Sequence, residues 1–163
     1  MSEAETMEST LHLTFRLENE LLALDVAQVR EVLDLCDITR VPRTPEFMRG
    51  VINLRGTVIP VIDLRHKFGM SRTESTIDAR IVVMEINLDG IDTVVGVLTD
   101  SVHDVIEIDN DKINPSPETG TRWRREYIKG IGKHGDQFIL LLDIDRVFSE
   151  KDMNAITDSR KET

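Results

Sequence analysis

The chain has 163 residues and a formal net charge of −10, enough for one domain or for two small subdomains packed together. Such acidity argues against nucleic acid and anionic membrane surfaces as partners, and no apolar run approaches the roughly 20 residues that span a bilayer. The single cysteine, Cys36, excludes an intrachain disulfide and favours a reducing compartment, so we expect a cytoplasmic protein.

The N-terminal part of the chain predicts short strands after a polar leader. Residues 1–10 are acidic and lack the features of a signal peptide, so we expect them to be disordered. Strict alternation of apolar and polar side chains then predicts a half-buried strand that places His12 on its polar face. The strands expected in this part of the chain span 11–17, 21–26 and 29–33.

A hairpin is the next predicted element. Two apolar runs, 51–54 and 58–62, flank the pair Arg55-Gly56, which is typical of antiparallel strands joined by a tight turn with an exposed cation at its tip. Because Pro60 cannot donate a ladder hydrogen bond, it predicts a sheet edge or a bulge. Asp63 is expected to be the N-cap of a short helix over 64–68.

The second part of the chain begins after a polar linker. We expect this linker at 71–78, strands at 80–86, 91–98 and 102–108, a long loop from Pro115, and a polar tail at 150–163. Within the loop, Arg122-Trp123-Arg124-Arg125 is either a protein contact or a cover over the end of the fold.

An internal repeat organises these elements. The segment 127–131 follows 47–51 at an offset of 80 residues, and Phe148 falls on Phe68 at the same offset. The repeat predicts an all-β fold of two five-stranded barrels side by side. We place them in one domain at 11–149, with approximate halves 11–70 and 79–149, and leave open whether the halves exchange strands.

Asp63 and Asp143, one in each half, are the residues that most suggest an enzyme. A carboxylate pair that shares a proton would make the chain a hydrolase. Helix capping explains both residues without catalysis, and we favour it. The four histidines have no zinc-ligand spacing, so no metal site is expected.

The sequence motifs resemble those of the CheW-like family of bacterial chemotaxis coupling proteins. The resemblance runs from about Leu11 to Phe148 and is carried by motifs that include Val29-Arg30-Glu31-Val32, Thr44-Pro45-Glu46-Phe47-Met48-Arg49-Gly50, Asn53-Leu54-Arg55-Gly56, Ile59-Pro60-Val61-Ile62-Asp63-Leu64-Arg65 and Pro115-Ser116-Pro117.

The resemblance implies a function as well as a fold. It implies two SH3-like barrels and a non-catalytic adaptor that joins the cytoplasmic tips of chemoreceptors to the regulatory domain of the histidine kinase CheA. It implies no cofactor, no small-molecule substrate and no direct membrane contact. A coupling protein for pilus motility or second-messenger control would carry the same motifs, so that alternative stays open.

Two sets of contact residues also follow from the resemblance. The receptor-facing set is Val29, Glu31, Asn53, Leu54, Arg55 and Gly56. Contacts with the similar domain of the kinase, within a ring of such domains, are implied for the turn from Pro115 to Glu118. Relatives often carry a basic residue before this turn and an aromatic residue after it, where this chain has Asn114 and Thr119. Trp123 is a candidate to replace the missing aromatic contact.

Overall fold

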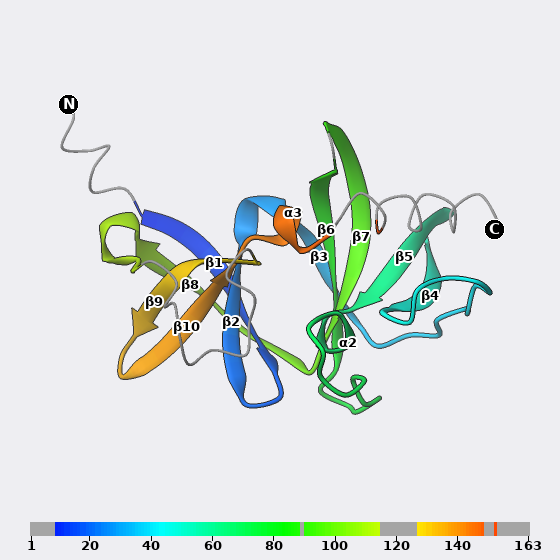
Figure 1. The fold of residues 1–163 in the computed structure, drawn as a ribbon, viewed down its shortest axis with the longest axis horizontal. Coiled ribbons are helices and arrows are strands. Elements are labelled where there is room, and N and C mark those ends of the chain that lie inside the picture. The colour runs from blue at the N-terminus through cyan, green and yellow to red at the C-terminus, as the bar shows by residue number, and fades with distance from the viewer. Residues whose placement is uncertain (1–8, 89, 115–126, 149–151, 153–163) are drawn as a thin grey trace.

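The structure is a computed structural model that describes residues 9–88, 90–114, 127–148 and 152. These residues form two five-stranded sheets that lie side by side along the longest axis of the molecule (Figure 1). The first sheet, in the order β8-β1-β2-β10-β9, contains β1 (Ser9–Leu17), β2 (Glu20–Asp25), β8 (Ser101–Asp109), β9 (Ile128–His134) and β10 (Gln137–Leu142). The second sheet, in the order β3-β6-β7-β5-β4, contains β3 (Val29–Asp34), β4 (Met48–Leu54), β5 (Thr57–Asp63), β6 (Arg80–Leu88) and β7 (Ile91–Thr99).

Apart from Asp152, which is also helical, the helices in the part of the chain that the structure describes are short connections. These connections are η1 (Val26–Gln28), α2 (Leu64–Lys67), η2 (Asn110–Lys112) and α3 (Ile144–Val147). The predicted all-β fold class with five strands in each unit is therefore confirmed.

The ends of the expected domain differ in detail from the prediction. β1 begins at Ser9, inside the segment expected to be a disordered leader, because Ser9 and Thr10 extend the ladder with β8. Within the expected polar tail, Asp152 is buried and its carboxylate accepts a hydrogen bond from Lys67 Nζ at 2.6 Å. The other tail residues lie outside the described part of the chain.

The two sheets do not follow the two halves of the sequence. The β1–β2 hairpin joins β8, β9 and β10, whereas the β6–β7 hairpin joins β3, β4 and β5. In the upstream part of each copy the repeat runs at an offset of 73 residues, where 101–105 matches 28–32, so β1 and β2 correspond to β6 and β7. Each copy therefore gives its leading hairpin to the sheet of the other copy. In both sheets the second strand of this hairpin pairs in parallel with the last strand of the other copy, through β2–β10 and β7–β5. The strand exchange that the sequence left open is present.

The two copies of the repeat form equivalent backbone hydrogen bonds. The amide of Asp63 donates to the carbonyl of Phe47 at 2.7 Å, and the amide of Asp143 donates to that of Tyr127 at 2.8 Å. An isolated bridge also forms in each sheet, Thr39 with Val51 and Asn114 with Ile131.

The two bridges explain a glycine that both copies carry. A Cβ on Gly50 would overlap the carbonyl oxygen of Thr39, and a Cβ on Gly130 would lie 2.6 Å from that of Asn114. Glycine is therefore required because the bridging backbone occupies the space of a side chain.

Pro60 lies in an interior strand, yet the strand has a ladder partner on only one side at this position, so the predicted edge holds at Pro60 and not for the strand as a whole. β5 stands between β7 and β4, and Pro60 is opposite Val51 of β4. The ladder with β7 runs only from Val61 to Asp63, so it begins one residue beyond the proline. The strand tolerates the missing N–H because its second ladder has not yet started at that position.

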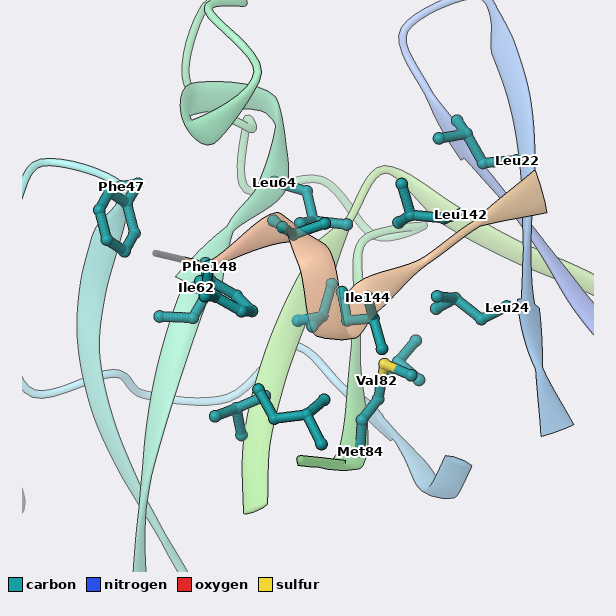
Figure 2. Close-up of a cluster of buried hydrophobic side chains, with 14 of the residues drawn as sticks. Leu22, Leu24, Phe47, Ile62, Leu64, Val82, Met84, Leu142, Ile144 and Phe148 are labelled. Carbon is teal, nitrogen blue, oxygen red and sulfur yellow. The ribbon is translucent and has the colours of Figure 1, made fainter. Parts of the chain in front are cut away.

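The largest hydrophobic core lies between the two sheets. Side chains from β2 and from the β10–α3 connection meet side chains of β5, β6 and α2 there, as Figure 2 shows. Phe47 packs on Phe148 with ring centroids 6.4 Å apart, and Phe68 packs on Tyr127 at 5.4 Å. The repeat pairs Phe47 with Tyr127 and Phe68 with Phe148, so the two aromatic contacts are equivalent and each joins one copy to the other. Each sheet also encloses a smaller apolar cluster of its own.

Substitutions at two glycines of β9 test the bridge. A Cβ on Gly130 would lie 2.5 Å from the Ile113 side chain and 2.6 Å from the Asn114 carbonyl, whereas the nearest atom to a Cβ on Gly132 is 3.5 Å away. We expect Gly130→Ala to lower the free energy of unfolding by about 2–3 kcal/mol, because the backbone must move to admit the methyl group. Gly132→Ala should cost less than about 1 kcal/mol. Urea unfolding of both variants measures the difference, and equal losses would contradict the role given to the bridge.

Candidate functional site

The tip of the β4–β5 hairpin is a tight turn built by the backbone conformation of two residues. Arg55 has φ of 50° and Gly56 has φ of 88°, so both lie in the left-handed region that a two-residue hairpin turn of this hand requires. The register is set by Leu54 opposite Thr57. Asn53 Oδ1 accepts a hydrogen bond from the Gly56 amide at 2.8 Å, which holds the turn closed. The motif Asn53-Leu54-Arg55-Gly56 thus forms a turn that is stabilised by a hydrogen bond within the motif itself.

An ion pair connects this tip to the opposite edge of the same sheet. Arg55 Nη2 donates to Glu31 Oε2 of β3, although β3 and β4 are the two outer strands of the sheet order. The sheet is therefore curled so that its edges approach one another. The Arg55 side chain remains 72% exposed, as its position at the tip predicts. The hydrogen bond to Glu31 raises the pKa of the Arg55 guanidinium, which is charged at every physiological pH.

The structure brings the receptor-facing residues expected from the sequence to one end of the second sheet. Glu31 meets the hairpin tip directly, and Val29 lies two residues earlier on β3. Val29 is half-buried against the core between the sheets, and Leu54 is half-buried against the core of the second sheet. The contact that the structure shows between the β3 residues and the hairpin residues of this set is the pair Arg55–Glu31, and Val29 and Leu54 pack against two different cores.

The second expected set is described only at one residue. Asn114 is exposed, and its amide and carbonyl bond to Ile131 at 3.0 and 2.7 Å. Pro115, Glu118, Thr119 and Trp123 lie outside the described residues.

Asp63 is a buried structural carboxylate. It is fully buried and accepts hydrogen bonds from the Thr73 amide at 3.0 Å, the Thr73 hydroxyl at 2.7 Å, Arg49 at 3.1 Å and the His66 amide at 3.4 Å. The last bond is the predicted N-cap of α2. Both carboxylate oxygens are therefore occupied by partners from three segments of the chain.

Asp143 occupies the N-cap position of α3, but it does not make the capping hydrogen bond that Asp63 makes at α2. Its side chain makes no capping hydrogen bond, is 28% exposed and pairs with Arg146 at 3.4 Å. The equivalence of Asp63 and Asp143 in sequence thus does not extend to their environments. Nothing in the geometry arranges them as a catalytic dyad, which needs two carboxylates that face a shared cleft.

Arg65 is a structural residue that the sequence analysis named only as the last residue of a family motif. Its guanidinium contacts Asp100 at 3.1 Å, Glu18 at 3.2 Å and Ser71 at 2.8 Å. Burial alone would lower the pKa of Arg65, but the hydrogen bonds and charges of Asp100 and Glu18 raise it overall. Because Glu18 belongs to the turn between β1 and β2, this network ties α2 of one sheet to a hairpin of the other. The motif around Arg65 marked the residue, yet no local pattern identified its partners.

His12 corrects the prediction of a polar strand face. Its side chain is only 3% exposed, because residues 12–15 of β1 are all buried and both faces of the strand are therefore covered at this point. Burial lowers the pKa of the imidazole and favours its neutral form. No cluster of three or more potential metal ligands occurs among the described residues. No helix in that part of the chain is long and apolar enough to cross a membrane.

Comparison with known proteins adds independent information. The family model for the CheW-like domain matches residues 11–152. The chain is 36% identical over 152 residues to the chemotaxis protein CheW of Klebsiella aerogenes, covering 91% of this chain and 87% of that protein. It is 34% identical over 141 residues to the chemotaxis protein CheW of Thermotoga maritima, covering 85% and 87%. The crystal structure of the scaffolding protein TtCheW from Thermoanaerobacter tengcongensis superposes with a TM-score of 0.78 at 37% identity, covering 89% and 91% of the two chains.

Substitution of the two aspartates separates structural from exposed carboxylates. Asp63→Asn places an amide NH₂ among donors in a buried site, so we expect the free energy of unfolding to fall by about 3 kcal/mol. The matched change Asp143→Asn removes a partly exposed pair and should cost less than about 1 kcal/mol. Chemical denaturation of both variants measures these changes. A loss at Asp143 as large as that at Asp63 would contradict the structural asymmetry.

Proposed function

The chain belongs to the CheW-like domain family, and from that premise we propose that it is a non-catalytic adaptor that couples chemoreceptor tips to the histidine kinase CheA in chemotaxis. The observation that carries the proposal is the surface formed by β3 and the β4–β5 hairpin tip. There the pair Arg55–Glu31 holds an exposed cation in a fixed place. The relatives named above as chemotaxis proteins CheW, and the scaffolding protein TtCheW, support the same class of function.

The receptor side of the proposal rests on the chemistry of this surface. A receptor tip is a helical hairpin, and an exposed edge with apolar and charged groups suits the side of a helix. Val29 and Leu54 would supply apolar contact, and Arg55 would pair with a carboxylate on the receptor. Such a pair fixes orientation and speeds association, because complementary charge steers the encounter.

The kinase side of the proposal uses a different part of the chain. We assign the contact with the regulatory domain of CheA to the turn that starts at Asn114 and continues through Pro115, Glu118 and Thr119. Trp123, four residues later in the sequence, belongs to the same proposed contact. The protein would then be cytoplasmic and would reach receptor arrays at the membrane through the receptors themselves. The coupling domain would span 11–149.

Charge reversal at Arg55 tests the receptor contact. Arg55→Glu places two carboxylates side by side at the tip and removes the cation, so affinity for a receptor tip fragment should fall at least roughly tenfold. The unfolding midpoint should change little, because an exposed pair contributes little to stability. The matched control is Arg146→Glu, which reverses another exposed, ion-paired arginine. Titration calorimetry with the receptor fragment and with the CheA regulatory domain measures both affinities.

The double variant Glu31→Arg with Arg55→Glu distinguishes two roles for the arginine. It restores the pair within the chain but leaves the wrong charge at the tip. If Arg55 contacts the receptor, the double variant should remain at least roughly tenfold weaker than the unmodified chain. Full recovery would show that only the intrachain pair matters. Normal receptor binding by Arg55→Glu alone would remove Arg55 from the site.

A further inference from the structure

A basic pocket lies away from the hairpin tip, beside α2. It has a volume of about 560 Å³ and is formed by residues 40–46, Met48 and Arg49 together with His66 of α2 and Arg72 of the following segment. Pockets that hold small molecules in proteins span roughly 300–1,000 Å³, so this one is large enough for a compound of moderate size.

The charge of the pocket is opposite to that of the chain. Arg40, Arg43 and Arg72 line it and are exposed, although the chain carries a net charge of −10. Among the residues that the structure describes, these three arginines have no carboxylate within ion-pair distance. The one carboxylate that lines the pocket, Glu46, is 88% exposed and pairs with His66 at 3.2 Å. Three cations that share one pocket repel each other unless an anion binds there.

The buried carboxylate of Asp63 holds the walls of the pocket in place. It binds Arg49 of β4, caps α2 through the His66 amide, and binds both the amide and the hydroxyl of Thr73, the residue after Arg72. Arg49 also donates to the Thr73 carbonyl at 3.0 Å. Because Arg49 forms an ion pair with Asp63, its positive charge is neutralised within the chain. The pocket is thus built on a rigid buried network, and the three remaining arginines are available to a ligand.

Arg43 adds an observation from the backbone. Its φ is 63°, in the left-handed region where glycine or asparagine is the usual residue. The Thr44 hydroxyl donates to the Val41 carbonyl at 2.9 Å and stabilises the turn around it. A bulky charged residue kept in a strained conformation at the wall of a pocket points to a role for its side chain.

We propose that this pocket binds a small polyanion that carries at least two adjacent phosphoryl groups. Guanidinium groups donate two parallel hydrogen bonds to phosphoryl oxygens, and three unpaired arginines match the charge of a diphosphate. A lone side-chain carboxylate would satisfy only one of them. The apolar groups of Val41, Pro45 and Met48 in the same pocket leave room for an organic portion of the ligand. This proposal does not depend on the coupling function.

Calorimetry on the full chain tests the proposal with defined probes: inorganic phosphate, inorganic pyrophosphate and ATP, at low ionic strength. The test variant is R40Q/R43Q/R72Q. The matched control, K112Q/K133Q/R146Q, removes the same charge from exposed positions outside the pocket. We expect saturable binding of pyrophosphate and ATP to the unmodified chain and to the control, at least tenfold weaker binding to the pocket variant, and weaker binding of phosphate throughout.

Three outcomes would overturn the proposal. Equal loss in the pocket variant and the control would show attraction to overall charge only. Absence of saturable binding by pyrophosphate and ATP would exclude a polyphosphate ligand. Tighter binding of a Glu-rich peptide than of pyrophosphate would assign the pocket to an acidic protein segment instead. Should the pocket variant fail to fold, amide chemical shifts of the unmodified chain with pyrophosphate decide: changes centred on 40–49, 66 and 72 support the site, and changes elsewhere refute it.

Discussion

The apolar contact between the two sheets is the interaction on which the rest of the molecule depends. Each sheet contains a hairpin from the other copy of the repeat, and the ring pairs Phe47–Phe148 and Phe68–Tyr127 join the copies in equivalent ways. Separation of the sheets would expose the largest core of the protein to water, where burial of each large apolar side chain is worth roughly 1.5–3 kcal/mol. The polar network of Arg65 reinforces the same junction. The orientation of the two sheets, and hence of any surface built on them, is fixed by this shared core.

Within this pseudo-symmetric frame the two copies carry different chemistry. The first hairpin has Arg55 at its tip, and at the corresponding position of the second hairpin Gly135 takes the same left-handed backbone conformation with φ of 64°. Asn53 supports the first turn, whereas Lys133, its counterpart, lies over the ring of Phe138. Duplication thus preserved a two-residue hairpin in each copy, although the turns differ because Gly56 has a positive φ and its counterpart Asp136 does not. The side chains made only one of the hairpins suitable for the receptor contact we propose.

The contrast between Asp63 and Asp143 shows how burial decides what a carboxylate does. Both follow a strand and precede a helical turn, so the sequence presents them as equals. Asp63 lies among donors that satisfy both of its oxygens, and it connects β4, α2 and the segment around Thr73. The walls of the basic pocket depend on that connection. A residue that suggested catalysis is instead the anchor of a site that the sequence pattern did not reveal.

The sequence by itself determined the strands, the turn at Arg55-Gly56, the cap at Asp63 and the internal repeat, because each follows from periodicity or from the conformational limits of a few neighbouring residues. It also identified, through family resemblance, the hairpin and β3 residues that the structure brings together. Only the tertiary structure decided that the hairpins exchange, that β5 is interior despite Pro60, that His12 is buried, and that Glu31 is the partner of Arg55 across 24 residues of sequence. It also decided that Gly50 and Gly130 must be glycines, since the backbone of a bridging residue, Thr39 or Asn114, occupies the space of their side chains. The physical reason is common to all of these: local sequence specifies how a segment bends and which of its faces is apolar, whereas the choice of partner depends on which distant segments can be packed without voids and without unpaired polar groups.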